Sequence, residues 1–194
     1  MSTPLRVSIC CWFALEVTLV VRDVVRGKGR QGRDRGTRAI VALSLVASIL
    51  LGVLLRGWVP ALNTPAADAF DVAGVVVIWM GLAIRVWAVI TLGDSFRTFI
   101  EAEADQAVVT RGPYRWVRHP SYTGLLLIAA GFGIGAGNWL SLVVGALVAL
   151  LGLLPRIAVE EAEMTRVLGE RYRIYQRTTH HLIPRLWYAL DSER

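Results

Sequence analysis

The residues with the greatest capacity for chemistry lie in two short polar segments, and the first is residues 112–124. It places His119 and Pro120 just after several arginines and directly before an almost purely apolar run. Proline suits the first turn of a helix because it has no amide hydrogen to lose there, and the residue before it avoids helical angles. We therefore expect His119 at a helix cap, with Ser121 and Tyr122 in the first turn. Free backbone amides at such a helix start favour a carboxylate or phosphate, and tyrosine faces attract cations such as a sulfonium.

The second polar segment begins at Arg156, where the last apolar run ends, and includes Glu160 and Glu161. Arg156 and Glu160 are four residues apart and so share one face of a helix. Arginine binds a carboxylate through two parallel hydrogen bonds, and glutamate accepts hydrogen bonds from ribose hydroxyls or an amino group. Taken alone, this spacing is equally typical of an ordinary ion pair on a helix surface. Its combination with the first segment favours a binding site built from both.

The composition predicts that both segments lie at a membrane surface. Hydrophobic residues make up 55% of the 194 residues, more than a soluble domain of this length buries. Five apolar segments stand out, most of them slightly shorter than the ~20 residues that span a bilayer comfortably. They are residues 5–21, 39–55, 72–90, 122–134 and 139–154. The fourth is the shortest, so it either begins inside the protein or forms a tight hairpin with the fifth across the Gly-Ala-Gly-Asn turn at 135–138. We expect an all-α integral membrane protein with about five transmembrane helices.

The distribution of basic residues predicts the orientation of these spans. The first loop, the third loop and the tail after the last span hold 18 of the 21 lysines and arginines. The positive-inside rule therefore places these three regions, with both polar segments and the C-terminus, in the cytoplasm and the N-terminus outside. We expect a multi-pass protein of the plasma (inner) membrane. The basic first loop is either a topology signal or a site of attraction for anionic headgroups; nothing indicates nucleic-acid binding.

The remaining polar residues carry weaker signals. Glu16 and Arg85 lie within spans, where charges are costly; they can pair with each other, or Arg85 can reach the interface. Glycines in the last two spans permit close helix contact. His180 and His181 lack further ligands at a suitable spacing, so we predict no metal site. The adjacent cysteines at 10 and 11 exclude a disulfide framework.

At the level of motifs, the chain resembles the isoprenylcysteine carboxyl methyltransferase family and its relatives, the phospholipid methyltransferases. The matching residues are Gly112, Tyr114, Arg118, His119, Pro120, Ser121, Tyr122 and Gly124, then Arg156, Glu160 and Glu161, then Leu168, Gly169, Glu170, Tyr172 and Tyr175. The likeness covers residues 93–184, whereas the first half matches only as a set of apolar spans. It implies one domain, with N-terminal spans at 1–90 and a catalytic half at 91–194.

The resemblance implies an S-adenosyl-L-methionine-dependent methyltransferase without a Rossmann domain, whose cofactor is enclosed by the cytosolic span ends and the helical tail. Carried over by position, the residues that would bind the cofactor are Gln106, Val108, Val109, Tyr114, His119, Pro120, Ser121, Tyr122 and Glu160. Arg156 would meet the substrate, and Arg156 and His119 would be the catalytic residues. Glu101 falls near a glutamine of the family pattern, which leaves its role open.

The chemistry of the acceptor stays open at this point. A carboxylate is already nucleophilic at neutral pH and needs alignment more than a base. An amine or thiol must lose a proton, which His119 or a glutamate would accept. The expected acceptor is the carboxylate of a prenylated cysteine or a similar lipophilic acid. The alternatives are a phospholipid amine or small thiol, or a non-catalytic protein that binds lipid.

Overall fold

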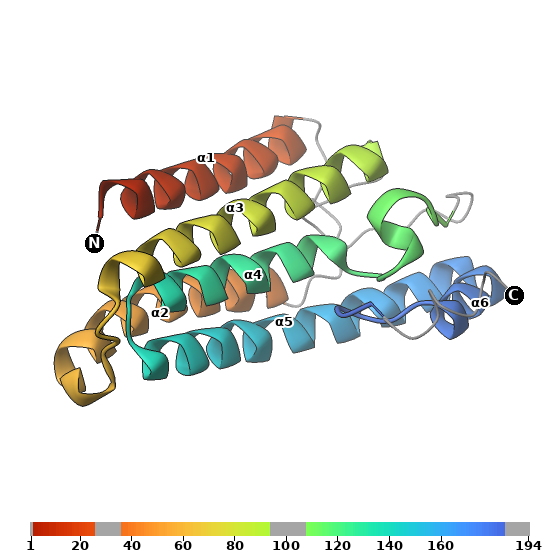
Figure 1. Ribbon diagram of the computed structural model, residues 1–194. Coiled ribbons are helices and arrows are strands. Elements are labelled where there is room, and N and C mark those ends of the chain that lie inside the picture. Colours follow the sequence, from red (N-terminus) through yellow and green to blue (C-terminus); the bar gives the residue numbers. More distant parts are fainter. Residues whose placement is uncertain (1, 26–35, 94–107, 185–194) are drawn as a thin grey trace, which may run out of the picture.

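The structure is a computed structural model that describes residues 2–25, 36–93 and 108–184, and these residues are almost entirely helical (Figure 1). The long helices are α1 (Thr3–Val25), α2 (Thr37–Trp58), α3 (Ala67–Leu92), α4 (Pro120–Gly135) and α5 (Trp139–Leu168). Short elements are the 3-10 turns η1 (Pro60–Leu62) and η3 (Gly112–Arg115) and the final helix α6 (Glu170–Thr178). Among the described residues, β structure is limited to two isolated bridges.

The five long helices run roughly along one common direction. α3 packs between α1 and α4, α4 packs between α3 and α5, and α2 lies against α5 (Figure 1). One end of the bundle collects the C-terminal ends of α1, α3 and α5, the N-terminal ends of α2 and α4, and also η3 and α6 (Figure 1). The helix ends that border the basic loops and the basic tail therefore lie at one end of the bundle, as the charge distribution predicts.

Four helices, α1, α2, α3 and α5, are long and apolar enough to cross a membrane. α4 has only 16 residues, which at ~1.5 Å per residue is shorter than the ~30 Å hydrocarbon core. The prediction of about five spans is confirmed with this qualification, and α4 begins inside the protein. α5 instead runs for 30 residues straight through Pro155, so it carries both Arg156 and Glu160 beyond the apolar part of the helix.

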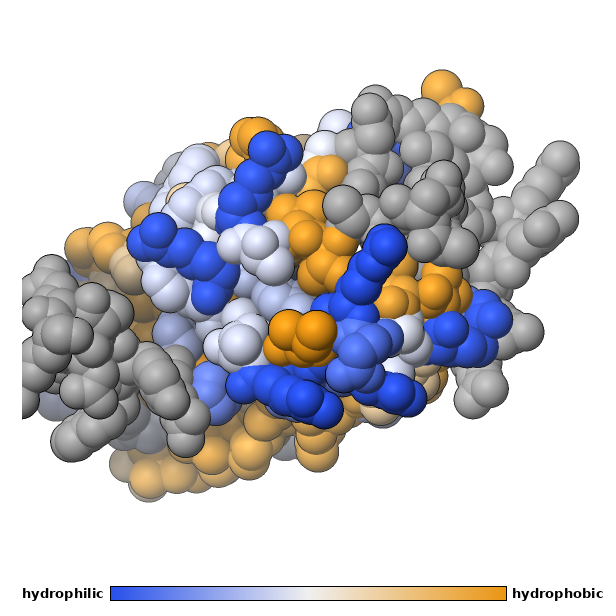
Figure 2. Space-filling model, turned by 90° about the vertical axis from the view of Figure 1, so that its right-hand side faces the viewer, coloured by the Kyte–Doolittle hydropathy of each residue, from blue (hydrophilic) through white to orange (hydrophobic). Residues whose placement is uncertain are grey.

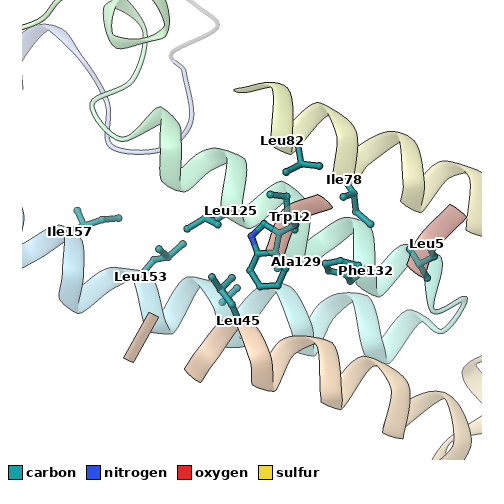
Figure 3. Packing of buried hydrophobic residues seen from close by; sticks show 12 residues of the cluster. Leu5, Trp12, Leu45, Ile78, Leu82, Leu125, Ala129, Phe132, Leu153 and Ile157 are labelled. Carbon is teal, nitrogen blue, oxygen red and sulfur yellow. The ribbon is translucent and has the colours of Figure 1, made fainter. Parts of the chain in front are cut away.

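Hydrophobic side chains lie both inside and outside the bundle, as expected of an integral membrane protein. The core gathers Trp12 of α1, Leu45 of α2, and Leu125 and Phe132 of α4 (Figure 3). Large apolar side chains also cover the outer surface; Ile90, for example, is 71% exposed. In water this surface would be strongly unfavourable, whereas in a bilayer lipid covers it.

Glycines let α3 and α4 approach each other closely. A Cβ on Gly81 would lie 2.6 Å from the Gly124 carbonyl oxygen, and one on Gly74 would lie 2.6 Å from that of Gly131. The predicted close contact at Gly124 and Gly131 is confirmed, and its partners are the two glycines of α3. This contact fixes the position of α4 relative to α3.

Small residues also join α2 to α5. The Ser48 hydroxyl donates to the Gly145 carbonyl oxygen at 2.8 Å, and the side chain of Ser44 fills the space beside Gly152. The turn before α5 is closed by Asn138, whose side chain accepts a hydrogen bond from the Ser141 amide at 3.0 Å. The predicted breaker at 135–138 therefore ends α4 and starts α5.

Hydrophilic side chains gather at the bundle end that carries η3 and α6. Figure 2 looks onto this end: hydrophilic residues lie across its centre with a few hydrophobic ones among them, and hydrophobic surface follows its lower flank. Both polar segments of the sequence meet here.

Candidate active site

The start of α4 has the geometry that the sequence predicts. His119 is the N-cap, with φ −121° and ψ 57°, and Pro120 occupies the first helical position. The His119 carbonyl oxygen accepts hydrogen bonds from the amides of Tyr122 and Thr123, both at 3.0 Å. The Tyr122 amide is therefore bonded within the helix, and the expectation that it would be free to bind an anion is wrong.

The amides before α4 are bonded to a segment that follows α6, residues 179–182, which we call the strap. The Arg118 amide donates to the His180 carbonyl oxygen at 2.7 Å, and the His119 amide donates to that of His181 at 3.0 Å. The Thr123 hydroxyl donates to the Leu182 carbonyl oxygen at 2.7 Å. The strap thus runs beside the first turn of α4 and satisfies backbone groups that the helix leaves unpaired.

His119 lies between two carboxylates of α5. Its Nδ1 is 3.4 Å from Glu160 and its Nε2 is 3.0 Å from Glu161. Since a carboxylate only accepts hydrogen bonds, both ring nitrogens carry protons. Burial disfavours the imidazolium, but the hydrogen bonds and charges of Glu160 and Glu161 outweigh burial and raise the pKa of His119 above 6.5. This arrangement does not fit the expected role of His119 as a proton acceptor.

Arg118 joins the strap to α5, a role that the sequence did not reveal. Its Nε donates to Glu161 at 2.7 Å, its Nη1 donates to the carbonyl oxygens of Gln176 (3.0 Å) and Thr179, and its Nη2 donates to Nε2 of His181 at 2.9 Å. Because Nε2 of His181 accepts this bond, its Nδ1 carries the proton and lies 3.2 Å from Glu161. Arg118 belongs to the family motif, but its partners could not be predicted because they lie 43 to 63 positions away in the sequence.

Arg156 is buried where α5 meets α4 and the start of α2, with 3% of its surface exposed. Its Nε donates to the Tyr122 hydroxyl at 3.2 Å, and its Nη1 donates to the Thr37 hydroxyl at 3.4 Å. The structure therefore brings together His119, Tyr122, Arg156 and Glu160 as expected, and it adds Thr37 at the start of α2, which no sequence signal marked.

Tyr114 reaches the same site from η3. The Tyr175 hydroxyl on α6 donates to the Tyr114 carbonyl oxygen at 2.6 Å. Burial, followed by the negative charge of Glu160, raises the pKa of the Tyr114 phenol well above its ordinary value. The phenol is therefore neutral at physiological pH, and it offers a hydroxyl and an aromatic face beside Glu160.

The other expected cofactor residues differ in how they are placed. Pro120 and Ser121 are buried beneath the site in the first turn of α4. Val108 is partly buried and packs against the cluster of Leu168, Tyr172 and Tyr175, and Val109 follows it. Gln106 and Glu101 lie outside the described residues.

Three possible metal ligands come together, contrary to the sequence-based expectation that no such set exists. One ligand atom each of His119, Glu161 and His181 lies within 4.8 Å of the others. The Arg118 guanidinium, however, is hydrogen-bonded to both Glu161 and His181. A metal ion here would have to displace that positive charge, so the cluster fits an ion-pair network better than a metal centre.

Glu16 and Arg85 do pair with each other. Nε of Arg85 lies 2.6 Å from Oε1 of Glu16, and its Nη2 donates to Oε2 at 2.7 Å. Arg85 also donates from Nη1 to the Ser121 hydroxyl at 2.6 Å. The pair therefore connects α1 and α3 to the first turn of α4.

Comparisons with known proteins agree with this arrangement. The model of the "Isoprenylcysteine carboxyl methyltransferase (ICMT) family" matches residues 73–166. A "Probable protein-S-isoprenylcysteine O-methyltransferase" of Oryza sativa subsp. indica is 31% identical over 159 residues, which cover 77% of this chain and 83% of that protein. The "Protein-S-isoprenylcysteine O-methyltransferase" of Tribolium castaneum is 32% identical over 113 residues, 57% of this chain and 40% of that protein.

A solved structure is also similar. It is described as the "eukaryotic intramembrane Ras methyltransferase ICMT", and it superposes with a TM-score of 0.62 at 28% identity. The match covers 75% of this chain and 52% of the solved chain.

Proposed function

The chain belongs to the isoprenylcysteine carboxyl methyltransferase family of membrane methyltransferases, and we propose that it methylates the carboxylate of a lipophilic, prenylcysteine-like acceptor with S-adenosyl-L-methionine as the donor. The observation that carries this proposal is the pairing of both His119 ring nitrogens with carboxylates. Glu160, Tyr114 and Tyr122 are then the groups proposed to bind the donor, and Arg156 is the group proposed to bind the acceptor.

The residues around Glu160 suit a methyl donor that carries a sulfonium, an ammonium, a carboxylate and a ribose. When bound, S-adenosyl-L-methionine supplies a methyl group that is activated by its positively charged sulfur. Glu160, with 19% of its side chain exposed, offers a carboxylate for the ribose or the ammonium. Tyr114 and Tyr122 offer aromatic faces for the sulfonium. Gln106, Val108 and Val109 belong to the proposed donor site by position alone.

The proton inventory of the site favours a carboxylate acceptor. An amine or thiol must lose a proton during methylation, so it needs a nearby base. His119 already carries protons on both nitrogens, Glu160 is already paired with its Nδ1, and Glu161 already accepts hydrogen bonds from Arg118 and His119. A carboxylate needs no base because it is ionised at neutral pH. The site is therefore better equipped to align an acceptor than to deprotonate one.

Arg156 is the residue that would align such an acceptor. Its Nε is hydrogen-bonded to the Tyr122 hydroxyl, which fixes the plane of the guanidinium beside the first turn of α4. The Tyr122 and Thr37 hydroxyls accept hydrogen bonds from Arg156 and hold its guanidinium in place. Arginine presents a planar fork of donors that matches a carboxylate.

We place the bundle end with α6 in the cytoplasm of a plasma (inner) membrane, on the charge distribution of the sequence. The polar donor would then enter from the cytoplasm, and the lipophilic acceptor would arrive sideways from the bilayer. This two-sided access accounts for a polar site at the edge of an apolar bundle.

Calorimetric titration of the detergent-purified protein with S-adenosylhomocysteine tests the donor. We expect saturable binding that Glu160→Ala weakens at least about tenfold, and that Glu163→Ala, three positions further along α5, leaves unchanged. Absence of binding by a folded wild-type protein would contradict the proposal.

The acceptor is tested by methyl transfer to three probes of the same prenyl chain length. These carry a free cysteine carboxylate, an amine with the carboxylate blocked, and a thiol. Turnover of the carboxylate alone is expected. Equal turnover of the blocked amine would show that the site does deprotonate its acceptor, and the argument from His119 would fail.

A further inference from the structure

Arg85 is a buried charge that the proposed reaction does not use directly. Only 5% of its surface is exposed, and it lies within α3, one of the helices that are long and apolar enough to cross a membrane. Glu16 of α1 meets it through two oxygens, at 2.6 and 2.7 Å. Charges within a span are costly in lipid and usually have a function, so this pair requires an explanation beyond packing.

The free edge of the Arg85 guanidinium extends to α4. Nη1 donates to the Ser121 hydroxyl at 2.6 Å and reaches the Ser121 carbonyl oxygen at 3.4 Å. Ser121 is itself only 6% exposed and lies between Pro120 and Tyr122. Arg85 therefore touches the turn that carries the site residues, but it touches none of their reactive atoms.

The close crossing of α3 and α4 makes this reach possible. A Cβ on Gly124 would lie 3.1 Å from both the backbone nitrogen and the Cβ of Arg85. Because glycine leaves that space open, the backbone of α4 lies directly beside Arg85. Its side chain can then reach Ser121, three residues before Gly124.

We propose that Arg85, held by Glu16, is a positioning residue that acts through Ser121. It fixes the first turn of α4 from the α3 side, and so sets the direction in which His119 and Tyr122 face their partners on α5. This inference rests on the proposed function, since its readout is affinity for the methyl donor. It predicts that losing the Arg85–Ser121 contact weakens donor binding even in a folded protein.

The test compares Arg85→Met, Ser121→Ala and the double variant in calorimetric titrations with S-adenosylhomocysteine. Each single variant should weaken binding by about tenfold, which is about 1.4 kcal/mol. The Kd of the double variant should exceed that of the weaker-binding single variant by no more than about twofold, because both changes remove the same interaction. Arg85→Lys keeps the positive charge and a donor for the Ser121 hydroxyl, so it should lose less donor affinity than Arg85→Met.

The matched control is Arg56→Met. Arg56 donates to the Ala136 carbonyl oxygen just beyond the opposite end of α4, so it also ties another helix to the α4 region but lies far from the site. It should lower the thermal midpoint of unfolding without changing donor affinity. If Arg85→Met likewise loses stability but binds the donor normally, Arg85 only holds the fold together and the proposal is wrong.

Additive losses in the double variant would also overturn the proposal, since Arg85 would then act independently of Ser121. A wild-type protein that binds no S-adenosylhomocysteine would instead refute the proposed function. The two failures are therefore distinguishable in the same titrations.

Discussion

Replacing Glu161 by glutamine should lower the thermal midpoint of unfolding by about 4–8 °C, because Arg118 would lose the only charged partner among its described contacts. Arg118 is 8% exposed, and its Nε lies 2.7 Å from Glu161. Removing one partner of a buried ion pair costs about 3–5 kcal/mol. Glutamine keeps the shape and one acceptor oxygen, so we expect a loss of about 2 kcal/mol. In a chain of this length each kcal/mol corresponds to about 2–4 °C.

The matched control lies two residues further along the same helix. The side chain of Glu163 is 13% exposed, the same fraction as that of Glu161, and it pairs with Arg166, whose side chain is 55% exposed. Glu163→Gln is the same chemical change opposite a solvent-exposed arginine, where an ion pair contributes little to stability. Unfolding of both variants would be followed in detergent by circular dichroism at pH 7. Equal shifts would refute the reasoning, since Glu161 would then be no more than another surface carboxylate.

Three further outcomes follow from the geometry. Arg156→Lys should keep the affinity for S-adenosylhomocysteine within about twofold of wild type but lower kcat by about a hundredfold, measured by transfer of a labelled methyl group, because lysine lacks the fork. Because the pKa of His119 is raised in the folded protein, His119 contributes fully to folding stability below pH 6.5. This contribution is lost as the pH rises through the pKa of His119 in the folded state. Burial and then Arg118 lower the pKa of His181 despite the opposing effect of Glu161. The contribution of His181 to folding stability is therefore present above pH 6.5 and lost on acidification. Thermal midpoints measured across pH should lose their alkaline decline in His119→Asn and their acidic decline in His181→Asn. Gly124→Ala should destabilise by about 1–3 kcal/mol in thermal melts, because a Cβ there meets a carbonyl oxygen of α3 at 2.6 Å, whereas Gly145→Ala, with 3.6 Å to its nearest neighbour, should be tolerated.

Local rules predicted the parts of the site that depend on neighbouring residues. The cap at His119 and the helix start at Pro120 follow from the conformational limits of proline, and the shared face of Arg156 and Glu160 follows from helical spacing. The pairing of Glu16 with Arg85 was one of two alternatives left open by the cost of charge in lipid, and it is confirmed.

Contacts between distant residues could not be predicted in this way. The strap reaches the start of α4 through backbone carbonyl oxygens, and backbone groups have no residue-type signal. The double pairing of His119 depends on how α5 packs against α4, where Gly133 lies directly beside the Leu142 backbone. Pro155 lies inside α5, although a proline in a helix interior usually kinks or breaks the helix.

The packing of α2 against α5 has a consequence for the two proposed substrates. The family model matches from residue 73 to 166, after α2 has ended. Thr37, at the start of α2, contacts Arg156, whereas the described residues proposed to hold the donor all come from η3, α4, α5 and the segment around Val108. A substitution at Thr37 would therefore alter the surroundings of Arg156, the residue proposed to align the acceptor, without changing any described residue proposed to hold the donor.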